Sequence, residues 1–280
     1  MFKLASKILL DTQDAETRQL AARAIAAGCD DTDDDEDIAS HDALCLLLAE
    51  MLRASHCEAE AGALALWKLA INCENKVLIA KAGAIPPLVA LLQNGTDLAK
   101  EYAAGALWYL ALDDNNNVLI AKAGAIPPLV ALLENGTDKA KLFAAGALWG
   151  LANNRDNGVS IVKAGAIPPL VALLENGTDE ATEHAAGALW HLCGGYGLEQ
   201  NVLIVKAGAI PPLVAHLQNA RTAPTSRNSS SRGPFAISRN TEGLYGASTS
   251  QSRRPGRSDR SSPSSRTAPT WQKGTPRGPS

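Results

Sequence analysis

Apolar residues follow a helical spacing in one segment of this chain after another. Between Thr12 and Gly28 they recur at steps of three and four residues, at Leu20, Ala21, Ala24, Ile25 and Gly28. Such a period places them on one face of an amphipathic helix. Residues 38–53 form a second, more strongly apolar segment that also predicts a helix.

The pattern then repeats at a fixed interval. The sequence Ala-Ala-Gly-Ala-Leu-Trp occurs at residues 103–108, 144–149 and 185–190, and a degenerate copy occurs at 62–67. These phrases end in evenly spaced tryptophans, Trp67, Trp108, Trp149 and Trp190. A second phrase, Ala-Gly-Ala-Ile-Pro-Pro-Leu-Val, begins at Ala82, Ala123, Ala164 and Ala207. Self-similarity at a period of about 20–50 residues is typical of stacked arrays, so we predict a solenoid.

Each unit contains signals for three helices. In one unit, a short helix over 117–122 is expected to end at Gly124, because glycine readily takes the left-handed backbone that closes a helix. Pro127 and Pro128 suit the first turn of the next helix, where a missing N–H costs nothing. A third helix is predicted over 137–153, with Thr137 as its N-cap.

Composition divides the chain into four parts. Residues 1–29 hold a degenerate N-terminal repeat helix, 30–37 an acidic loop, 38–219 the array with its last repeat truncated, and 220–280 a basic Ser/Arg/Pro-rich tail. From Arg221 onward, 11 basic and 2 acidic residues give +9, and the remaining 15 basic and 27 acidic residues give −12. So few apolar residues in the tail predict disorder. The opposite charges leave two readings open, a freely solvated tail or an intramolecular contact between the tail and the array.

The second and third helical phrases together resemble the armadillo repeat, the repeat of β-catenin and importin-α, over about residues 12–218. The resemblance implies an all-α fold, a right-handed armadillo-repeat superhelical solenoid with three helices per unit of about 41 residues. It also implies that the third helices line a concave groove that holds extended peptides.

The resemblance can be tested against the pair with which importin-α-like repeats grip nuclear-localisation peptides, a Trp followed four residues later by Asn. The Trp place falls on Leu64, Gly105, Gly146 and Gly187. The Asn place falls on Lys68, Tyr109, Gly150 and His191. No unit keeps the pair, which counts against a nuclear transport adaptor.

Several residues are candidates for contact with a bound peptide. The repeated tryptophans suit either an aromatic ladder along the groove or packing at the joints between third helices. The repeated Gly before them allows either close packing or access for a bound chain. Lys68, Tyr109 and His191 vary where the rest of the unit does not, through recognition or through drift. Glu60, Glu101 and Glu183 share one place and predict an acidic groove edge. The predicted groove residues are Trp67, Trp108, Trp149, Trp190, Lys68, Tyr109, His191, Asn154, Glu101 and Glu183.

Chemistry-bearing motifs are sparse. The acidic loop lacks the Gly of a calcium loop, and His184, His191 and Cys193 lack a third ligand at zinc spacing, so neither metal nor cofactor is expected. No nucleophile or phosphate-binding motif stands out, so we expect no enzymatic activity.

The same observations bear on compartment and partners. Five cysteines without metal-type pairing favour free thiols in a reducing compartment. No signal peptide and no apolar run of about 20 residues is apparent, so we expect an intracellular protein, cytoplasmic, nuclear or both, without membrane insertion. The favoured function is a scaffold or adaptor for protein or peptide partners, with no specific nucleic acid. The alternatives are a nuclear transport adaptor and a structural assembly in which the uncovered C-terminal unit stacks on another chain.

Overall fold

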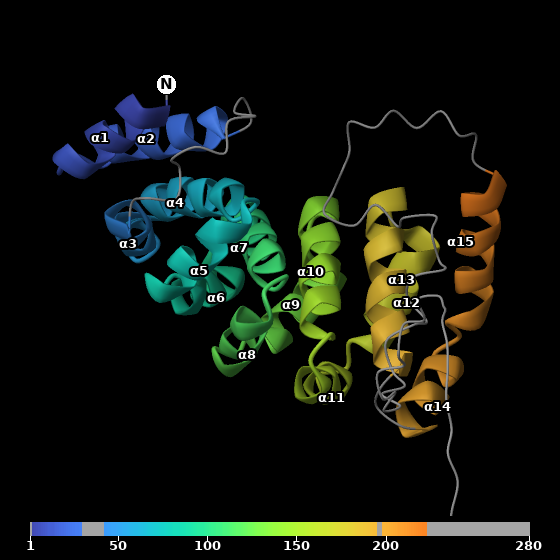
Figure 1. Cartoon of the computed structure of the whole chain (residues 1–280). Coiled ribbons are helices and arrows are strands. Elements are labelled where there is room, and N and C mark those ends of the chain that lie inside the picture. The colour runs from blue at the N-terminus through green and yellow to red at the C-terminus, as the bar shows by residue number, and fades with distance from the viewer. Residues whose placement is uncertain (1, 30–41, 195–197, 223–280) are drawn as a thin grey trace, which may run out of the picture. The chain divides into compact units, whose positions relative to one another are not determined.

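The computed structural model of the protein describes residues 2–29, 42–194 and 198–222 (Figure 1). The chain divides after Ala223 into two units, and every described residue belongs to the first. The predicted acidic loop and all of the predicted tail except residues 220–222 lie outside the described residues.

Fifteen helices and no strands occur in the described residues. They are α1 (Phe2–Asp11), α2 (Ala15–Gly28), α3 (Asp42–Met51), α4 (His56–Leu69), α5 (Cys73–Lys81), α6 (Ile85–Asn94), α7 (Asp97–Leu110), α8 (Asp114–Lys122), α9 (Ile126–Asn135), α10 (Asp138–Leu151), α11 (Arg155–Lys163), α12 (Ile167–Asn176), α13 (Asp179–Gly194), α14 (Leu198–Lys206) and α15 (Ile210–Thr222).

These helices form repeating units of a short first helix, a second helix and a longer third helix. The complete units are α5–α7, α8–α10 and α11–α13. The third helices α2, α4, α7, α10 and α13 pack against one another in that order. The all-α solenoid predicted from the repeated phrases is therefore confirmed.

Local signals place the helix ends close to the prediction. Gly124 has φ of 80° just after α8, and α9 begins with prolines in its first turn. The Thr137 side chain accepts a hydrogen bond from the N–H of Ala140 and caps α10. The short helix predicted over 117–122 is α8, and it begins three residues earlier, at Asp114. It starts there because the Asp113 carboxylate accepts hydrogen bonds from the backbone N–H groups of Asn115 and Asn116.

The N-terminus differs from the prediction of a single degenerate helix. Residues before Thr12 form α1, whose Leu9 is fully buried. The helices are separate because Asp14 caps α2, its carboxylate accepting a hydrogen bond from the N–H of Thr17 at 2.8 Å. This end of the array is thus a pair of helices, α1 and α2.

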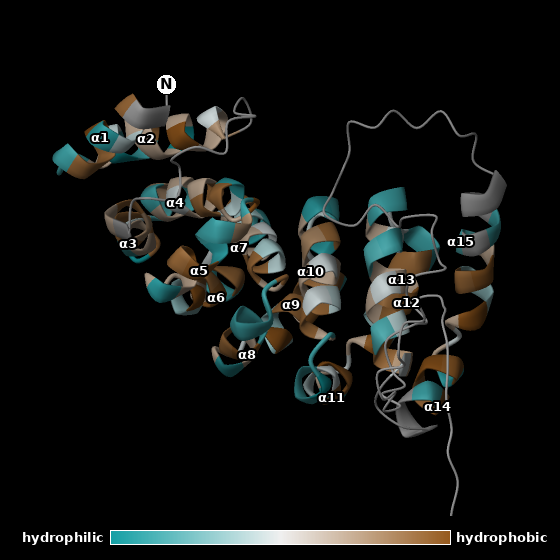
Figure 2. Ribbon diagram, viewed as in Figure 1, coloured by the Kyte–Doolittle hydropathy of each residue, from teal (hydrophilic) through white to brown (hydrophobic). Residues whose placement is uncertain are grey.

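Alanine and leucine make up most of the core, which runs continuously from α1 to α15. Figure 2 shows apolar residues recurring along the array, with α9 among the strongly apolar helices. Within the described residues no single helix could cross a membrane. Three bent first–second helix pairs, α5–α6, α8–α9 and α11–α12, meet the length and composition of a span, with bends of 83–85°.

Buried asparagines join the first helices of neighbouring units. The Asn116 Nδ2 donates to the carbonyl of Lys76 at 3.2 Å, and the Asn157 Nδ2 donates to the carbonyl of Asn117 at 3.2 Å. We call these contacts the asparagine ladder. Because both amides are buried, their hydrogen bonds satisfy groups that water does not reach.

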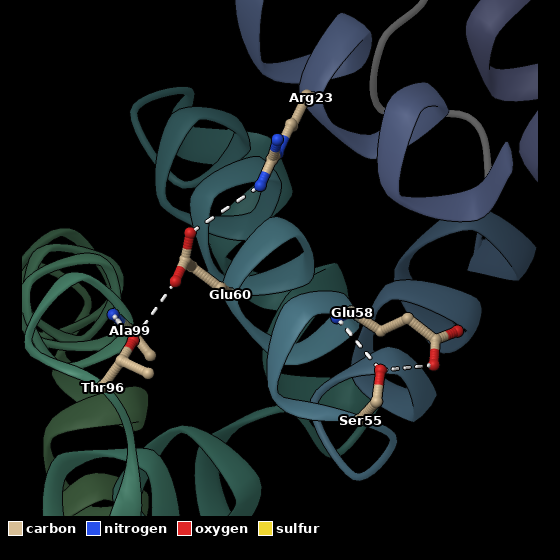
Figure 3. A network of polar contacts seen from close by, with 6 residues as sticks. All are labelled: Arg23, Ser55, Glu58, Glu60, Thr96 and Ala99. Carbon is tan, nitrogen blue, oxygen red and sulfur yellow. Dashed lines mark hydrogen bonds and ion pairs between the residues drawn. The ribbon is translucent and has the colours of Figure 1, made fainter. Parts of the chain in front are cut away.

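Glutamates on the third helices reach the caps of the next third helix. The Thr96 hydroxyl donates to Glu60 at 3.2 Å, and the Thr137 hydroxyl donates to Glu101 at 2.6 Å. We call these contacts the Glu–Thr latch. Figure 3 shows the first of them, where Glu60 also forms an ion pair with Arg23 at 3.8 Å. The latch ties each cap to the preceding unit.

Candidate functional site: the third-helix face

Aromatic side chains from α4, α7, α10 and α13 meet in one continuous row. Trp67 lies 5.9 Å from Tyr102 and 5.0 Å from Phe143, measured between ring centroids. Trp108 lies 6.0 Å from Phe143 and 4.6 Å from His184. These separations are those of interacting aromatic pairs.

The row continues toward the C-terminal end. Trp149 lies 5.8 Å from His184 and 6.3 Å from His191, and Trp190 lies 4.8 Å from His191. We call Trp67, Tyr102, Phe143, Trp108, His184, Trp149, His191 and Trp190 the aromatic row, and the surface of α4, α7, α10 and α13 that carries it the third-helix face.

Each of the first three repeat tryptophans packs on the glycine of the next unit. A methyl group added to Gly146 would lie 2.9 Å from ring atoms of Trp108, and one added to Gly187 would lie 2.6 Å from Trp149. At Gly105 the added methyl would lie 2.9 Å from the indole nitrogen of Trp67. Distances this short leave no room for a side chain, so the glycine admits the ring.

This Trp–Gly contact explains both repeated residues. The glycine stands at the Trp place of importin-α-like repeats, and the ring that fills the space beside it comes from the preceding unit. Of the two readings of the glycine, close helix packing is the one the geometry fits. Both interpretations of the tryptophans apply, because these residues pack at the joints between third helices and also form a row along one face.

Three members of the row were absent from the predicted groove set. Tyr102, Phe143 and His184 stand at one place in successive third helices, one full repeat apart, where the preceding unit has Ala61. Because the three residues differ in chemistry, they do not stand out as a repeat. Their even spacing and the ring in each side chain could nevertheless have been found in the sequence.

The row is closed at its centre and more open toward its ends. Trp108 is 7% exposed and Phe143 is 8% exposed, whereas Trp67 and Trp149 are half-buried and Trp190 is 66% exposed. Side chains at the variable place lie beside the tryptophans and are half-buried: the Lys68 Nζ is 5.2 Å from the centre of the Trp67 ring, and the Tyr109 ring is 4.7 Å from Trp108.

Burial changes the titration of several groups in the row. Burial lowers the pKa of His184, with smaller opposing effects from the Leu142 carbonyl at 3.3 Å and from Glu180. It also lowers the pKa of His191 and raises the pKa of Tyr109. Both imidazoles are therefore held toward their neutral form, which suits their tilted and edge-on contacts with the tryptophan rings.

The predicted acidic edge is not formed by Glu101. Its side chain is 7% exposed, and its carboxylate accepts the hydrogen bond of the Glu–Thr latch. Glu60 and Glu183 are half-buried at the same place in their units, and Glu60 is engaged with Arg23. Asn154 caps α11, where its side chain accepts hydrogen bonds from two backbone N–H groups. Any contact of Glu183 or Asn154 with a peptide stays a prediction.

No group of three or more metal-ligating side chains comes together in the described part of the chain. Two equivalent cavities of about 420 and 410 Å³ are lined by the second helices and the first turns of the third helices of neighbouring units, without any residue of the aromatic row. Pro127 and Pro128 line the first, and Pro168 and Pro169 line the second.

Fold and face together define a class, an all-helical solenoid of three-helix repeats with an aromatic row along its third helices. The family model of the armadillo/beta-catenin-like repeat matches residues 72–112 and 156–194. These two segments are therefore armadillo/beta-catenin-like repeats. None of the curated proteins compared matches the sequence.

Solved structures share this architecture. The designed armadillo repeat protein YIII(Dq)4CqI has a TM-score of 0.69 at 24% identity, covering 81% of this chain and 94% of its own. A designed armadillo repeat protein in complex with the peptide (KR)4 has a TM-score of 0.67 at 24% identity, covering 81% and 93%. An engineered protein has a TM-score of 0.68 at 28% identity, covering 81% and 90%.

Proposed function

We propose that this protein is an interaction scaffold that binds extended peptide segments of partner proteins along its third-helix face. The observation that carries the proposal is the aromatic row, in which rings from α4, α7, α10 and α13 follow one another in contact. Rings supply a large apolar contact area at little cost in side-chain entropy, which suits them to hold a chain that has no fold of its own.

The row offers a repeated platform with variable neighbours. Lys68, Tyr109, Gly150 and His191 occupy one place in successive units and present a cation, a phenol, no side chain and an imidazole. A peptide lying across the third helices would meet a different group at each unit while its apolar residues rest on the rings. A designed protein with the same fold holds the peptide (KR)4, and this likeness of fold supports the proposal.

The importin-like alternative has less support. Glycine replaces the Trp of the gripping pair at Gly105, Gly146 and Gly187. The rings that take up this space belong to the joints between units, and the Nε1 atoms of Trp67 and Trp108 are buried without a hydrogen-bond partner. Those indole N–H groups are not available to a peptide backbone.

Peptide selection followed by mutagenesis tests the proposal. Random peptides are selected for binding to the full chain, and the affinities of the selected peptides are measured by fluorescence polarisation. We expect Tyr109→Ala and His191→Ala to weaken binding by about tenfold or more, because aromatic residues at interfaces are frequent hot spots. Helical circular dichroism should be unchanged, since both side chains are half-buried at the surface.

Leu98→Ala is the matched control. Leu98 is an exposed apolar residue at the start of α7, the helix that carries Tyr109, and it takes no part in the aromatic row. Its truncation should leave the affinity unchanged. If the Tyr109 and His191 variants also bind like wild type, the binding surface is not the third-helix face.

A further inference from the structure

The C-terminal end of the array is uncovered in a way that the internal units are not. Ile85, Ile126 and Ile167 begin their second helices with 3–4% of their surface exposed, whereas the equivalent Ile210 of α15 is 52% exposed. Four residues further on, the valines of those internal helices are 5–6% exposed, whereas Val214 is 46% exposed. Trp190 shows the same contrast with Trp108, at 66% against 7%.

One missing element accounts for all three exposures. In the internal units α6, α9 and α12 pack against the third helix that follows them, and each repeat tryptophan packs on the glycine of the next third helix. Within the described residues no third helix follows α15. Trp190, Ile210 and Val214 are thus exposed on α13 and α15, the two helices against which a next third helix would pack, and we call this exposed surface the end slot. The helix α15 packs against α12, and Figure 2 shows that α15 carries apolar residues.

Internal units show which helix fits such a slot. At the corresponding positions α7, α10 and α13 each place a glycine against the preceding tryptophan. Each also carries a ring three residues before that glycine, at Tyr102, Phe143 and His184, close to the same tryptophan. The slot thus calls for a helix with an Ala/Gly face and one aromatic residue a turn before the glycine.

At the register of the internal units, the chain's own continuation does not carry this pattern. Stepping from Gly208 by the interval that separates Gly165 from Gly187 reaches Ser230. The residue three before it is Arg227, where α7, α10 and α13 carry a ring. Arginine at an apolar contact would be buried without a partner.

A second copy stacked head to tail is also a poor fit. Its outermost third helix would be α2, where the glycine place is taken by Arg23. That side chain is 54% exposed, reaches toward Glu60, and would stand where the Trp190 ring needs open backbone. The other glycine-bearing helices, α7, α10 and α13, are already packed inside their own array.

We propose that the end slot docks a helix of a different protein, an Ala/Gly-faced helix with an aromatic residue three positions before its central glycine. Trp190 would pack on that glycine as Trp149 packs on Gly187, and the helix would cover Ile210 and Val214. This site shares Trp190 with the end of the third-helix face but lies beyond the places of Lys68, Tyr109 and His191, at which peptide preference is proposed to be set. It adds a second kind of partner, a helix held end-on to the array.

A synthetic peptide tests the slot directly. The probe has the sequence of residues 137–153, which is α10 with its own cap, and carries a fluorescent label. Its binding to the full chain is followed by fluorescence polarisation. The matched control peptide carries Gly146→Leu, because a leucine side chain would occupy the space of the Trp190 ring. We expect the control to bind about tenfold more weakly or worse, as for the loss of a central interface contact.

Variants of the full chain locate the site. Trp190→Ala and Ile210→Asp should each weaken probe binding about tenfold or more, and both residues are exposed enough to change without unfolding the array. Tyr109→Ala should leave probe binding unchanged, which separates the end slot from the third-helix face. Failure of the probe to bind, or equal binding of the Gly146→Leu peptide, would overturn the proposal. If light scattering shows a dimer that Trp190→Ala abolishes, the end slot binds a second copy of this chain, and the proposal of a helix from a different protein is wrong.

Discussion

The Trp–Gly joint makes a sharp prediction about a substitution that helix propensity alone would favour. Gly146 lies within α10, where alanine is normally better than glycine by about 1 kcal/mol. A methyl group at this position, however, would lie 2.9 Å from three atoms of the Trp108 ring. That ring is 7% exposed and is held by contacts with Phe143 and His184, so it has little room to move.

The two effects oppose each other, and their sizes decide the sign. Overpacking a tight core costs about 1–3 kcal/mol, which exceeds the propensity gain. We therefore expect Gly146→Ala to destabilise the protein by up to about 2 kcal/mol, the difference between these terms. In a Trp108→Ala background, which itself costs about 3–5 kcal/mol, the ring is gone and the same change should stabilise by up to about 1 kcal/mol.

Urea unfolding of the four proteins, followed by circular dichroism, measures this double-mutant cycle. Circular dichroism is preferred because one variant removes a fluorescent tryptophan, and the slopes must agree for the midpoints to be compared. Gly194→Ala, where nothing lies within 4 Å of the added methyl, is the control and should be neutral or slightly stabilising. Stabilisation by Gly146→Ala in the wild-type background, or the same effect in both backgrounds, would refute the reasoning.

Three further changes probe the other contacts between units. Asn116→Ala removes one rung of the asparagine ladder and with it a buried hydrogen bond, so urea midpoints should show a loss of about 0.5–1.5 kcal/mol, against almost none for exposed Asn115→Ala. Thr137→Ala should cost more than Thr178→Ala, because both lose a helix cap but only Thr137 also loses a Glu–Thr latch. Burial lowers the pKa of His184, so the unfolded chain takes up a proton more readily and stability should fall as the pH drops through about 6.5. His184→Phe should reduce that fall, measured between about pH 7.5 and about pH 5.5.

The repeated phrases were enough to predict the helices, because caps and turns act locally. Gly124 and Thr137 each determine a boundary through their own backbone or side chain, and the structure places them where the phrases indicated. The helix before Thr12 was missed for the complementary reason. It occurs at the start of the array, where no repeated phrase marks its counterpart.

Contacts between units were harder to predict, because the two residues in contact stand at different places within the repeat. Trp108 meets Gly146 and not its own counterpart Trp149, so aligning the repeats does not bring the two contacting residues together. A shared place also does not determine where a side chain points. Glu101 occupies an expected groove place, yet its carboxylate is taken by the Thr137 hydroxyl and buried.

The aromatic row links binding to stability and so constrains which residues can set specificity. A ring such as Trp108 fills the joint between two units, and changing it to suit a peptide would loosen the array. Side chains at the place of Tyr109 and His191 lie beside the rings, whereas Gly150 at the same place packs closely on Ala111 of the preceding unit. Differences in peptide preference should therefore concentrate at this place, while the rings supply contact area common to every ligand. A peptide that rests on the half-buried rings also covers the edges of the joints beneath them. Peptide binding should therefore raise the free energy of unfolding of the array.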